Sequence, residues 1–467
     1  MDPLPADAPA HRHVHQHVDE MRFSRRHLKV WLLSAAGLLM GGYSFVSVGV
    51  ALPLMAKDPN FPITVWQTGA IAAAAVFGRM LGAILFGSLV DRYGRKIMYR
   101  LDPLIVVVFG IATVLSPNPW VMILFQVLFG MGIGGDYPIC SAYVSEVMPK
   151  RIRSRMVACV MASQAVGSVL AALVGFLLLW LMPDILTWHW ILASIVPFAL
   201  IVFLFRLTIP ESPKWLAEQG RIDEAATAIK KLLGPDAELD LPKQAPVKQA
   251  EKSSWGELLG PAMRGRTILT CVPWLCMDIA VYGVGIFTPI ILVQLHMGGT
   301  VAGIDNMFVA QRLGAIEGSV FMDIFLVVGF ALGIALMNKV TRIRMQILGF
   351  LCMAVGLSLI ATGSLRGNDM VFIVAGFILF NTMMNAGPNL STYTIPSEVF
   401  PVRLRASGHG LATGAGKLGA TAGVILFPIV QKHLGLMATL AIVAAFAVMG
   451  AVVTFLFKVA PDVASGE

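Results

Sequence analysis

The chain has 467 residues, of which 57% are hydrophobic and only 13% are charged, and its formal net charge is +8. The charged share is about half of the roughly 25% that is usual in globular domains, which excludes an ordinary soluble enzyme, a disordered protein and a small secreted scaffold. Because each membrane-spanning helix takes about 20 apolar residues, the composition fits a helical membrane protein with many spans and short loops.

Twelve apolar runs are long enough to span a membrane. They lie near residues 29–55, 64–90, 101–117, 119–143, 155–182, 188–208, 266–295, 316–338, 346–364, 371–395, 407–430 and 433–458. They divide the chain into a polar tail with alternating histidines (1–28), a six-helix half (29–208), a linker (209–265), a second six-helix half (266–458) and a short tail (459–467). We expect the first tail to be solvated and disordered, with metal binding by its histidines as the alternative. Residues 221–233 have the pattern of an amphipathic helix.

Lys and Arg are distributed unevenly over the loops. The loops after spans 2, 4, 8 and 10 hold thirteen of them, whereas the opposite loops hold four. Because cytoplasmic loops of membrane proteins are enriched in Lys and Arg, we expect both tails and the linker to be cytoplasmic. The implied location is the inner membrane of the cell, which the chain crosses many times.

A ten-residue segment after span 4 recurs after span 10. Residues 145–154 (SEVMPKRIRS) and 397–406 (SEVFPVRLRA) share six identities at an offset of 252. Equivalent positions in two halves imply a pseudo-two-fold axis along the membrane normal, with a substrate site between the halves at the midplane. We therefore predict an all-α membrane protein with twelve transmembrane helices in two pseudo-symmetric six-helix halves.

The seventh span carries a polar stripe. Trp274, Asp278 and Tyr282 are spaced i, i+4, i+8, which places them on one helix face. A polar stripe inside an apolar helix should face a cavity and not lipid. Burial favours the protonated form of a carboxyl group, so Asp278 and Asp136 are candidate proton carriers. The alternative for each is a hydrogen bond that packs neighbouring helices.

A basic residue, Arg79, is expected at mid-membrane. It precedes Asp91 by twelve residues, which is about 18 Å along a helix. An unpaired Arg is costly at that depth. One hypothesis is that Arg79 contacts an anionic substrate, and the alternative is a structural ion pair with Asp136 or Asp323.

Several motifs resemble the major facilitator superfamily. Residues 87–96 (GSLVDRYGRK) match its signature after span 2, and residues 210–216 (PESPKWL) look like its sugar-porter-like branch. The finer resemblance is to the phosphate:proton symporter group. It rests on 134–138 (GGDYP), the W-x3-D-x3-Y spacing of span 7, 387–389 (GPN) and 416–417 (GK).

The resemblance implies a set of substrate contacts at matching positions: Tyr137, Gln164, Trp274, Asp278, Tyr282 and Asn389. Lys417 would balance charge there, or pair with Asp278 in an empty site. A carboxylate beside hydroxyl, indole and amide donors would select a protonated oxyanion such as dihydrogen phosphate. Tyr137 and Asn389 are 252 residues apart, as symmetry mates should be. Asp136 and Asp278 would carry the proton.

A second group of charged residues lies at the ends of the spans. Asp91, Arg92 and Arg95 follow span 2, and related pieces in each half pair Glu146 with Arg153 and Glu398 with Arg405. We expect such pairs to latch one conformation. The alternative is that the basic residues only set the membrane topology.

The chain departs from the phosphate group in span 1. That group carries a D-x-x-D arrangement where residues 41–44 here read GGYS. We predict a proton symporter that imports a small oxyanion, first of all inorganic phosphate, by alternating access. The alternatives are an organic-acid or other metabolite:proton symporter and a nutrient receptor that does not transport. We expect a monomer with no cofactor, metal or nucleic acid, and no enzyme activity, because no HExxH or GxSxG motif is present.

Overall fold

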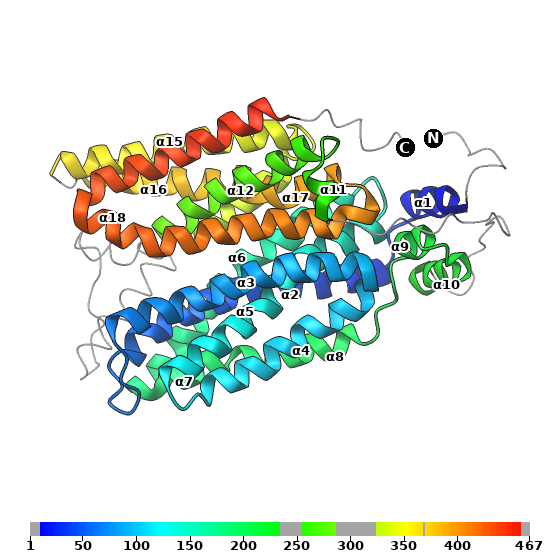
Figure 1. Ribbon diagram of the computed structural model, residues 1–467. Helices are drawn as coiled ribbons and strands as arrows, with labels where there is room; N and C mark the ends of the chain where they lie inside the picture. Colours follow the sequence, from blue (N-terminus) through cyan, green and yellow to red (C-terminus); the bar gives the residue numbers. More distant parts are fainter. Residues whose placement is uncertain (1–9, 234–254, 286–323, 368, 459–467) are drawn as a thin grey trace.

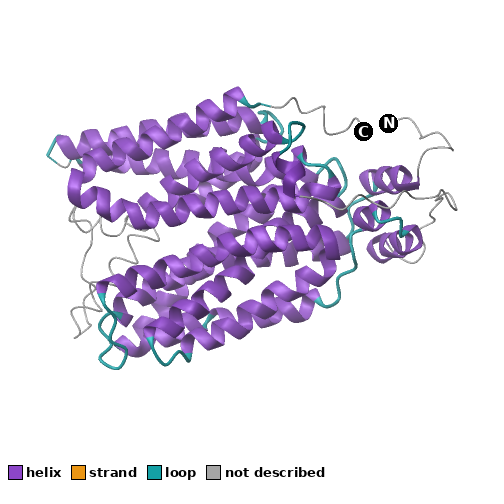
Figure 2. Ribbon diagram, in the orientation of Figure 1, coloured by secondary structure: helices purple, strands orange, loops and turns teal. Residues whose placement is uncertain are grey.

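The computed structural model describes residues 10–233, 255–285, 324–367 and 369–458, and these residues form helices and connecting loops (Figure 2). Eleven described helices are long and apolar enough to cross a membrane, and Ile324–Leu336 is a shorter apolar helix. The predicted eighth span, 316–338, lies partly outside the described residues. The fold class is the all-helical membrane architecture that the sequence predicts.

The first half contains the spans α2 (Arg25–Met55), α3 (Val65–Tyr93), α4 (Arg95–Val114), α5 (Pro119–Val147) and α6 (Arg153–Leu181), followed by η1 (Ile185–Thr187), α7 (Trp188–Ala193) and α8 (Ile195–Arg206). The second half contains α12 (Arg264–Gly285), α15 (Arg342–Leu365), α16 (Met370–Met384), the π-helical turn η2 (Asn385–Asn389), α17 (Leu390–Val399), η3 (Val402–Leu404) and α18 (Arg405–Leu456). The two halves lie side by side (Figure 1).

Local sequence signals begin and end these helices. Ser24 and Thr64 form capping boxes with His27 and Gln67 at the starts of α2 and α3. Asn118 caps α5 just before Pro119, which explains the tight turn after α4. In α18 the last two predicted spans are continuous except at Gly435, whose φ of 80° reverses the chain direction.

Glycines let the helices approach at backbone distance. A Cβ built on Gly78 of α3 would lie 2.0 Å from the carbonyl oxygen of Val127 in α5. The same device joins the two halves, because a Cβ on Gly410 of α18 would lie 2.3 Å from the carbonyl oxygen of Ala83 in α3. A Cβ on Gly87 of α3 would lie 2.7 Å from the carbonyl oxygen of Ala406.

Four helices outside the spans lie at one end of the bundle, which we call the linker side (Figure 1). They are α1 (Ala10–Glu20), α9 (Pro213–Glu218), α10 (Ile222–Leu233) and α11 (Trp255–Leu259). The expectation of a disordered first tail is wrong for residues 10–20. Val14 and Val18 of α1 are fully buried against Trp215 and Ile229 of the linker helices, and this apolar stripe holds the helix in place.

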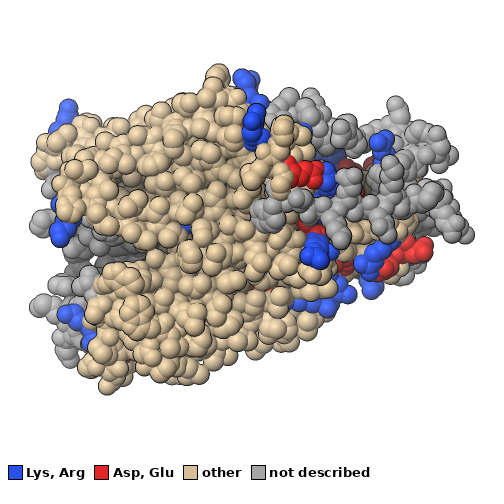
Figure 3. Space-filling view, viewed as in Figure 1, with Lys and Arg blue, Asp and Glu red and all other residues tan. Residues whose placement is uncertain are grey.

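The exposed surface follows the expected membrane topology. In the view of Figure 3, Lys, Arg, Asp and Glu gather at the linker side and a few basic residues lie at the other end, whereas the broad surface between them is uncharged. Exposed large apolar residues such as Leu104, Leu177 and Val355 belong to this band. They are positioned to contact lipid tails.

The glycine contact between α3 and α5 predicts a local cost in stability. Replacing Gly78 by Ala should lower the free energy of unfolding by about 1–3 kcal/mol, because the added methyl group overlaps backbone. Gly69→Ala on the same helix is the matched control, since no atom lies within 4 Å of its Cβ position. Thermal unfolding of the purified protein in detergent measures both variants. Equal midpoints would contradict the packing described here.

Candidate functional site

Two buried groups from different helices of the second half meet at the membrane centre. Lys417 of α18 donates from Nζ to Asp278 Oδ2 at 2.8 Å and to the Tyr282 hydroxyl at 3.1 Å. All three side chains are nearly fully buried. Asp278 and Tyr282 share one face of α12, as their spacing predicts, and Lys417 is the cation that makes a carboxylate tolerable there.

The first half contributes Tyr137 and Gln164 to the same region. The Tyr137 hydroxyl of α5 donates to Gln164 Oε1 of α6 at 2.8 Å. Its ring lies 6.4 Å from the Trp274 ring of α12 and 5.2 Å from Lys417 Nζ. The structure therefore brings six of the predicted residues together between the halves: Tyr137, Gln164, Trp274, Asp278, Tyr282 and Lys417.

Two aromatic neighbours of this cluster were not predicted from the sequence. The Tyr393 ring of α17 lies 6.2 Å from Tyr137 and 6.3 Å from Trp274, and the His409 ring of α18 lies 5.6 Å from Trp274. The spacing gave a signal for both. Tyr393 follows Asn389 by one helical turn, and His409 precedes Lys417 by two turns on the same face.

Asn389 does not join the cluster through a hydrogen bond in the described part of the chain. Its side-chain amide donates to Asn385 Oδ1 at 2.8 Å, within the π-helical turn η2. Pro388 lies in the same turn and removes one backbone donor. Asn389 is buried near the cluster because Tyr393, one turn further on, contacts it.

Arg79 of α3 is buried with part of its guanidinium unsatisfied. Its Nη2 donates to the carbonyl oxygen of Gly41 at 3.1 Å and to Ser44 Oγ at 2.7 Å, both on α2. Its Nε and Nη1 have no hydrogen-bond partner among the described residues. Of the two structural partners considered for it, Asp136 pairs elsewhere and Asp323 lies outside the described residues. A buried guanidinium with two open donors is expensive unless a ligand fills them.

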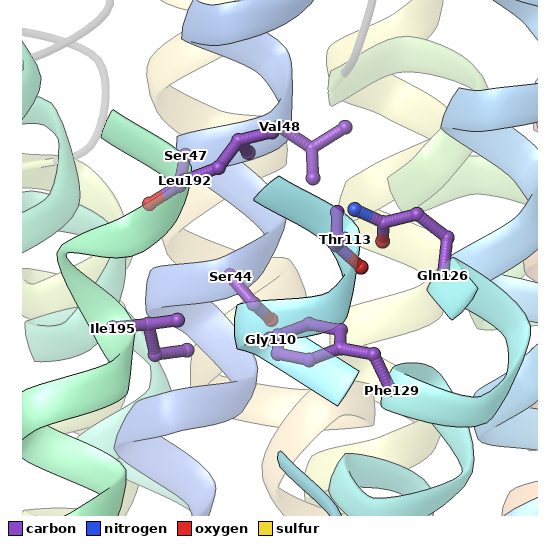
Figure 4. A pocket seen from close by; sticks show the side chains of 9 residues that line it. All are labelled: Ser44, Ser47, Val48, Gly110, Thr113, Gln126, Phe129, Leu192 and Ile195. Carbon is purple, nitrogen blue, oxygen red and sulfur yellow. The ribbon is translucent and has the colours of Figure 1, made fainter. Parts of the chain in front are cut away.

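A polar pocket adjoins the Ser44 end of this contact. It encloses an empty space of about 270 Å³ and is lined by Ser44, Ser47, Val48, Gly110, Thr113, Gln126, Phe129, Leu192 and Ile195 (Figure 4). Ser47 Oγ, Thr113 Oγ1 and Gln126 Oε1 have no hydrogen-bond partner among the described residues. These three oxygens on three helices offer hydrogen-bonding sites for buried water inside the first half.

Asp136 faces away from the central cluster, into the first half. Its Oδ1 accepts from Arg206 Nη2 of α8 at 2.8 Å, and the same guanidinium donates from Nη1 to both oxygens of Asp102 on α4 at 2.9 and 3.0 Å. Cys140 Sγ donates to Asp136 Oδ1 at 3.1 Å. Neither Asp102 nor Arg206 was singled out from the sequence.

Charged residues on the linker side connect the two halves. Arg95 donates to Glu146 at 2.7 Å and to Asp91 at 3.2 Å, and all three side chains are buried. Asp91 Oδ2 in turn accepts from the backbone amide of Ser407 at 2.7 Å and from its hydroxyl at 2.8 Å. Because Ser407 begins α18, this network joins the halves on the linker side.

The pairing within the repeated motif differs from the expected one. Glu146 lies 3.9 Å from Arg405 of the other half and does not pair with Arg153. Arg153 instead donates to Asp19 of α1. Glu398 accepts from Ser154 Oγ at 2.6 Å and lies 3.2 Å from Arg342, so its partner is not Arg405. The repeats face each other across the axis, so each acidic residue meets groups of the opposite half.

Arg92 has no comparable place in the network. Its guanidinium lies over the exposed ring of Tyr93, 5.3 Å from the centroid. The side chain is exposed, as the alternative of a topology-setting positive charge would have it.

Comparisons with known proteins agree with this arrangement. The family described as "Sugar (and other) transporter" matches residues 30–461. The inner membrane metabolite transport protein YgcS of Escherichia coli is 28% identical over 457 residues, which cover 96% of each chain. The repressible high-affinity phosphate permease of Neurospora crassa is 27% identical over 87% of this chain and 78% of the permease.

Among solved structures, the proton:xylose symporter XylE of the major facilitator superfamily, bound to 6-bromo-6-deoxy-D-glucose, superposes with a TM-score of 0.74. The two chains are 17% identical, and the match covers 93% of this chain and 96% of XylE. At that identity the likeness concerns the fold.

The chain is thus a membrane transporter with the major facilitator fold. It belongs to the family of sugar and other transporters, because the family match spans nearly its whole length. The predicted superfamily is confirmed, and the relatives named above are transporters and not enzymes.

On the linker side, Lys214 and Asp19 give the docking of α1 a pH dependence. Lys214 Nζ lies 2.5 Å from Asp19 Oδ1, and burial lowers the pKa of Lys214 from 10.5 to about 7. Burial alone would raise the pKa of Asp19, but the charges of Lys214 and Arg153 outweigh it and lower that pKa. Docking therefore disfavours protonated Lys214 and favours ionised Asp19.

The sign of the effect follows from these two shifts. Docking of α1 should strengthen as pH rises above about 7, by at most tenfold per pH unit, because the docked lysine releases a proton that the undocked one keeps. Hydrogen exchange of residues 10–20 between pH 7 and 9, corrected for the intrinsic rate, measures it. Lys214→Met should remove the dependence, whereas Lys231→Met, at an exposed position of α10, should keep it. Identical profiles for both variants would contradict the assignment.

Proposed function

We propose that this transporter carries a small oxyanion, with inorganic phosphate as the first candidate, together with a proton. It would import both by alternating access across the inner membrane, with the linker side in the cytoplasm. The observation that carries the anion assignment is Arg79, whose Nε and Nη1 are buried at the membrane centre without a partner among the described residues. An oxyanion offers the two acceptors that a guanidinium fork requires.

The surrounding groups favour a protonated oxyanion. Lys417 and Tyr282, together with Trp274 and Gln164, supply donors, and Asp278 supplies an acceptor. Because dihydrogen phosphate carries two P–OH donors, it satisfies the Asp278 carboxylate, whereas a fully ionised anion such as sulfate would be repelled. Lys417 would exchange its contact with Asp278 for the substrate as the site fills.

The contacts between the halves support alternating access. The Asp91–Ser407 hydrogen bonds and the Arg95–Glu146 ion pair join the halves on the linker side. Each contact is polar and reversible, so a transition that opens this side would break them and expose the central cluster there. Such charge pairs bias one of two global states in the manner of a switch element.

A specific observation favours a second candidate, an organic acid. Tyr137, Trp274 and Tyr393 form an aromatic wall beside the cations, and such a wall provides apolar surface for a carbon skeleton. YgcS is named as a metabolite transport protein. In this case Arg79 would bind a carboxylate through its fork.

Uptake of labelled phosphate into proteoliposomes tests the leading candidate. We expect an inward proton gradient to drive accumulation above equilibrium. Arg79→Gln should raise KM about ten- to a hundredfold, because it removes charged hydrogen bonds worth about 1.5–3 kcal/mol. Arg366→Gln is the matched control, since that arginine is exposed at the end of α15. Unchanged KM in Arg79→Gln would remove the anion contact from the proposal.

Competition separates the two candidates. If phosphate is the substrate, organic acids should leave its uptake unchanged, and Arg79→Lys should retain much of it because lysine also binds phosphate as a point charge. If a carboxylate is the substrate, labelled organic acids should accumulate in place of phosphate. Arg79→Lys should then fail, since lysine cannot form the planar fork.

A further inference from the structure

The buried cluster of Asp102, Asp136 and Arg206 is short of one positive charge. The three side chains come from α4, α5 and α8 and are at most 1% exposed. One guanidinium faces two carboxyl groups, so the cluster has one net negative charge if both are ionised. An uncompensated charge of this kind is costly inside a membrane.

The contacts show where a proton would complete the cluster. The two carboxyl groups lie within hydrogen-bonding reach of each other. Asp136 Oδ2 has no donor among the described residues. Two carboxylates cannot hydrogen-bond to each other, but a carboxylic acid and a carboxylate can, with the proton between them. A single proton therefore neutralises the cluster and supplies the missing hydrogen bond.

Asp278 is in the opposite situation. Its carboxylate is compensated one-to-one by Lys417 Nζ at 2.8 Å, so this pair is neutral without any added proton. Arg79 is the third buried charge, and its open Nε and Nη1 call for an anion. Of the three charge centres, one is complete, one requires an anion and one requires a proton.

We propose that Asp102 and Asp136 together hold the transported proton, shared between them beside Arg206, and that Asp278 stays ionised with Lys417. This inference rests on the proposed proton symport and names its proton site. On release, the O–H bond of the shared carboxyl breaks and the proton passes to water. The cluster is left with one negative charge, held by Arg206. Tyr137 follows Asp136 directly in α5, so a shift of this segment changes the substrate site and the proton site together.

Helix α2 makes room for the cluster and supplies no acid to it. A Cβ on Gly37 would lie 2.2 Å from Arg206 Nη2 and 2.6 Å from the Asp136 carboxyl group. The contribution of α2 is the carbonyl oxygen of Leu33, which accepts from Arg206 Nη2 at 3.0 Å. The acids missing from residues 41–44 are thus matched by a pair on α4 and α5.

The other titratable groups around the cluster are neutral at physiological pH. Tyr99 of α4 lies under Arg206 with its ring centroid 3.9 Å from Cζ, and Cys140 of α5 donates to Asp136. Tyr143 of α5 packs on Tyr99, and Tyr393 of α17 approaches from the second half. No described group among these supplies the missing positive charge, so the added proton must.

Infrared spectroscopy of the purified protein in lipid bilayers tests the site without any substrate. We expect the carbonyl band of a protonated carboxylic acid at neutral pH, which both Asp102→Asn and Asp136→Asn abolish. Each variant leaves one carboxylate facing Arg206, so the cluster becomes neutral and the protein should fold. Asp278→Asn should keep the band. A band that survives in Asp102→Asn, or that disappears only in Asp278→Asn, would overturn the shared site.

Transport assays test the consequence. Asp102→Asn should keep substrate counterflow within about twofold of the unmodified protein but lose accumulation driven by the proton gradient. Asp184→Asn, at an exposed cap outside the spans, is the control and should accumulate normally. Normal accumulation by Asp102→Asn refutes the proposal. If the unmodified protein takes up no anion at all, the proposed function fails, and the infrared result still decides whether the acid pair holds a proton.

Discussion

Charge compensation in a medium without water is the constraint on which this structure depends. A lone charge in the membrane interior costs several kcal/mol, so each must meet an opposite charge or a ligand. Lys417 and Asp278 meet each other, Arg206 meets two carboxyl groups, and Arg79 meets only a carbonyl and a hydroxyl. The same constraint that stabilises the helix bundle thus leaves two defined deficits, one of each sign. A symporter that carries an anion with a proton supplies both at once.

Much of the fold follows from local sequence. The spans could be predicted because long apolar runs have few other stable structures in a membrane, and the stripe of Trp274, Asp278 and Tyr282 could be predicted because helical periodicity places them together. Partners could not be predicted in the same way. Asp102 and Arg206 are 104 residues apart, and nothing in the spacing of either indicates the other. The helix α1 was missed because its alternating histidines obscure the burial of Val14 and Val18, one turn apart.

The repeated motif shows how symmetry misleads a reading of one segment. Within each copy an acidic residue stands close in sequence to arginines, and local pairing is the simplest expectation. The structure instead turns the copies toward each other, so that Glu146 approaches Arg405 and Glu398 bonds to Ser154. Two related segments that meet across an axis satisfy each other's charges. The linker helices then add contacts that belong to one half, such as the Ser212 hydroxyl on Glu146 at 2.6 Å.

The glycine contact between α3 and α18 has a mechanical consequence. Where Gly87 and Gly410 meet, each helix presents bare backbone to the other, and there are no interlocked side chains to withdraw before the helices tilt. Such a contact behaves as a smooth bearing, with little friction against a rocking motion. Resistance to the motion then comes from the polar bonds of Asp91 and Arg95 beside it. Pivot and lock are separate parts, so evolution can tune how tightly one face closes without changing how freely the halves turn.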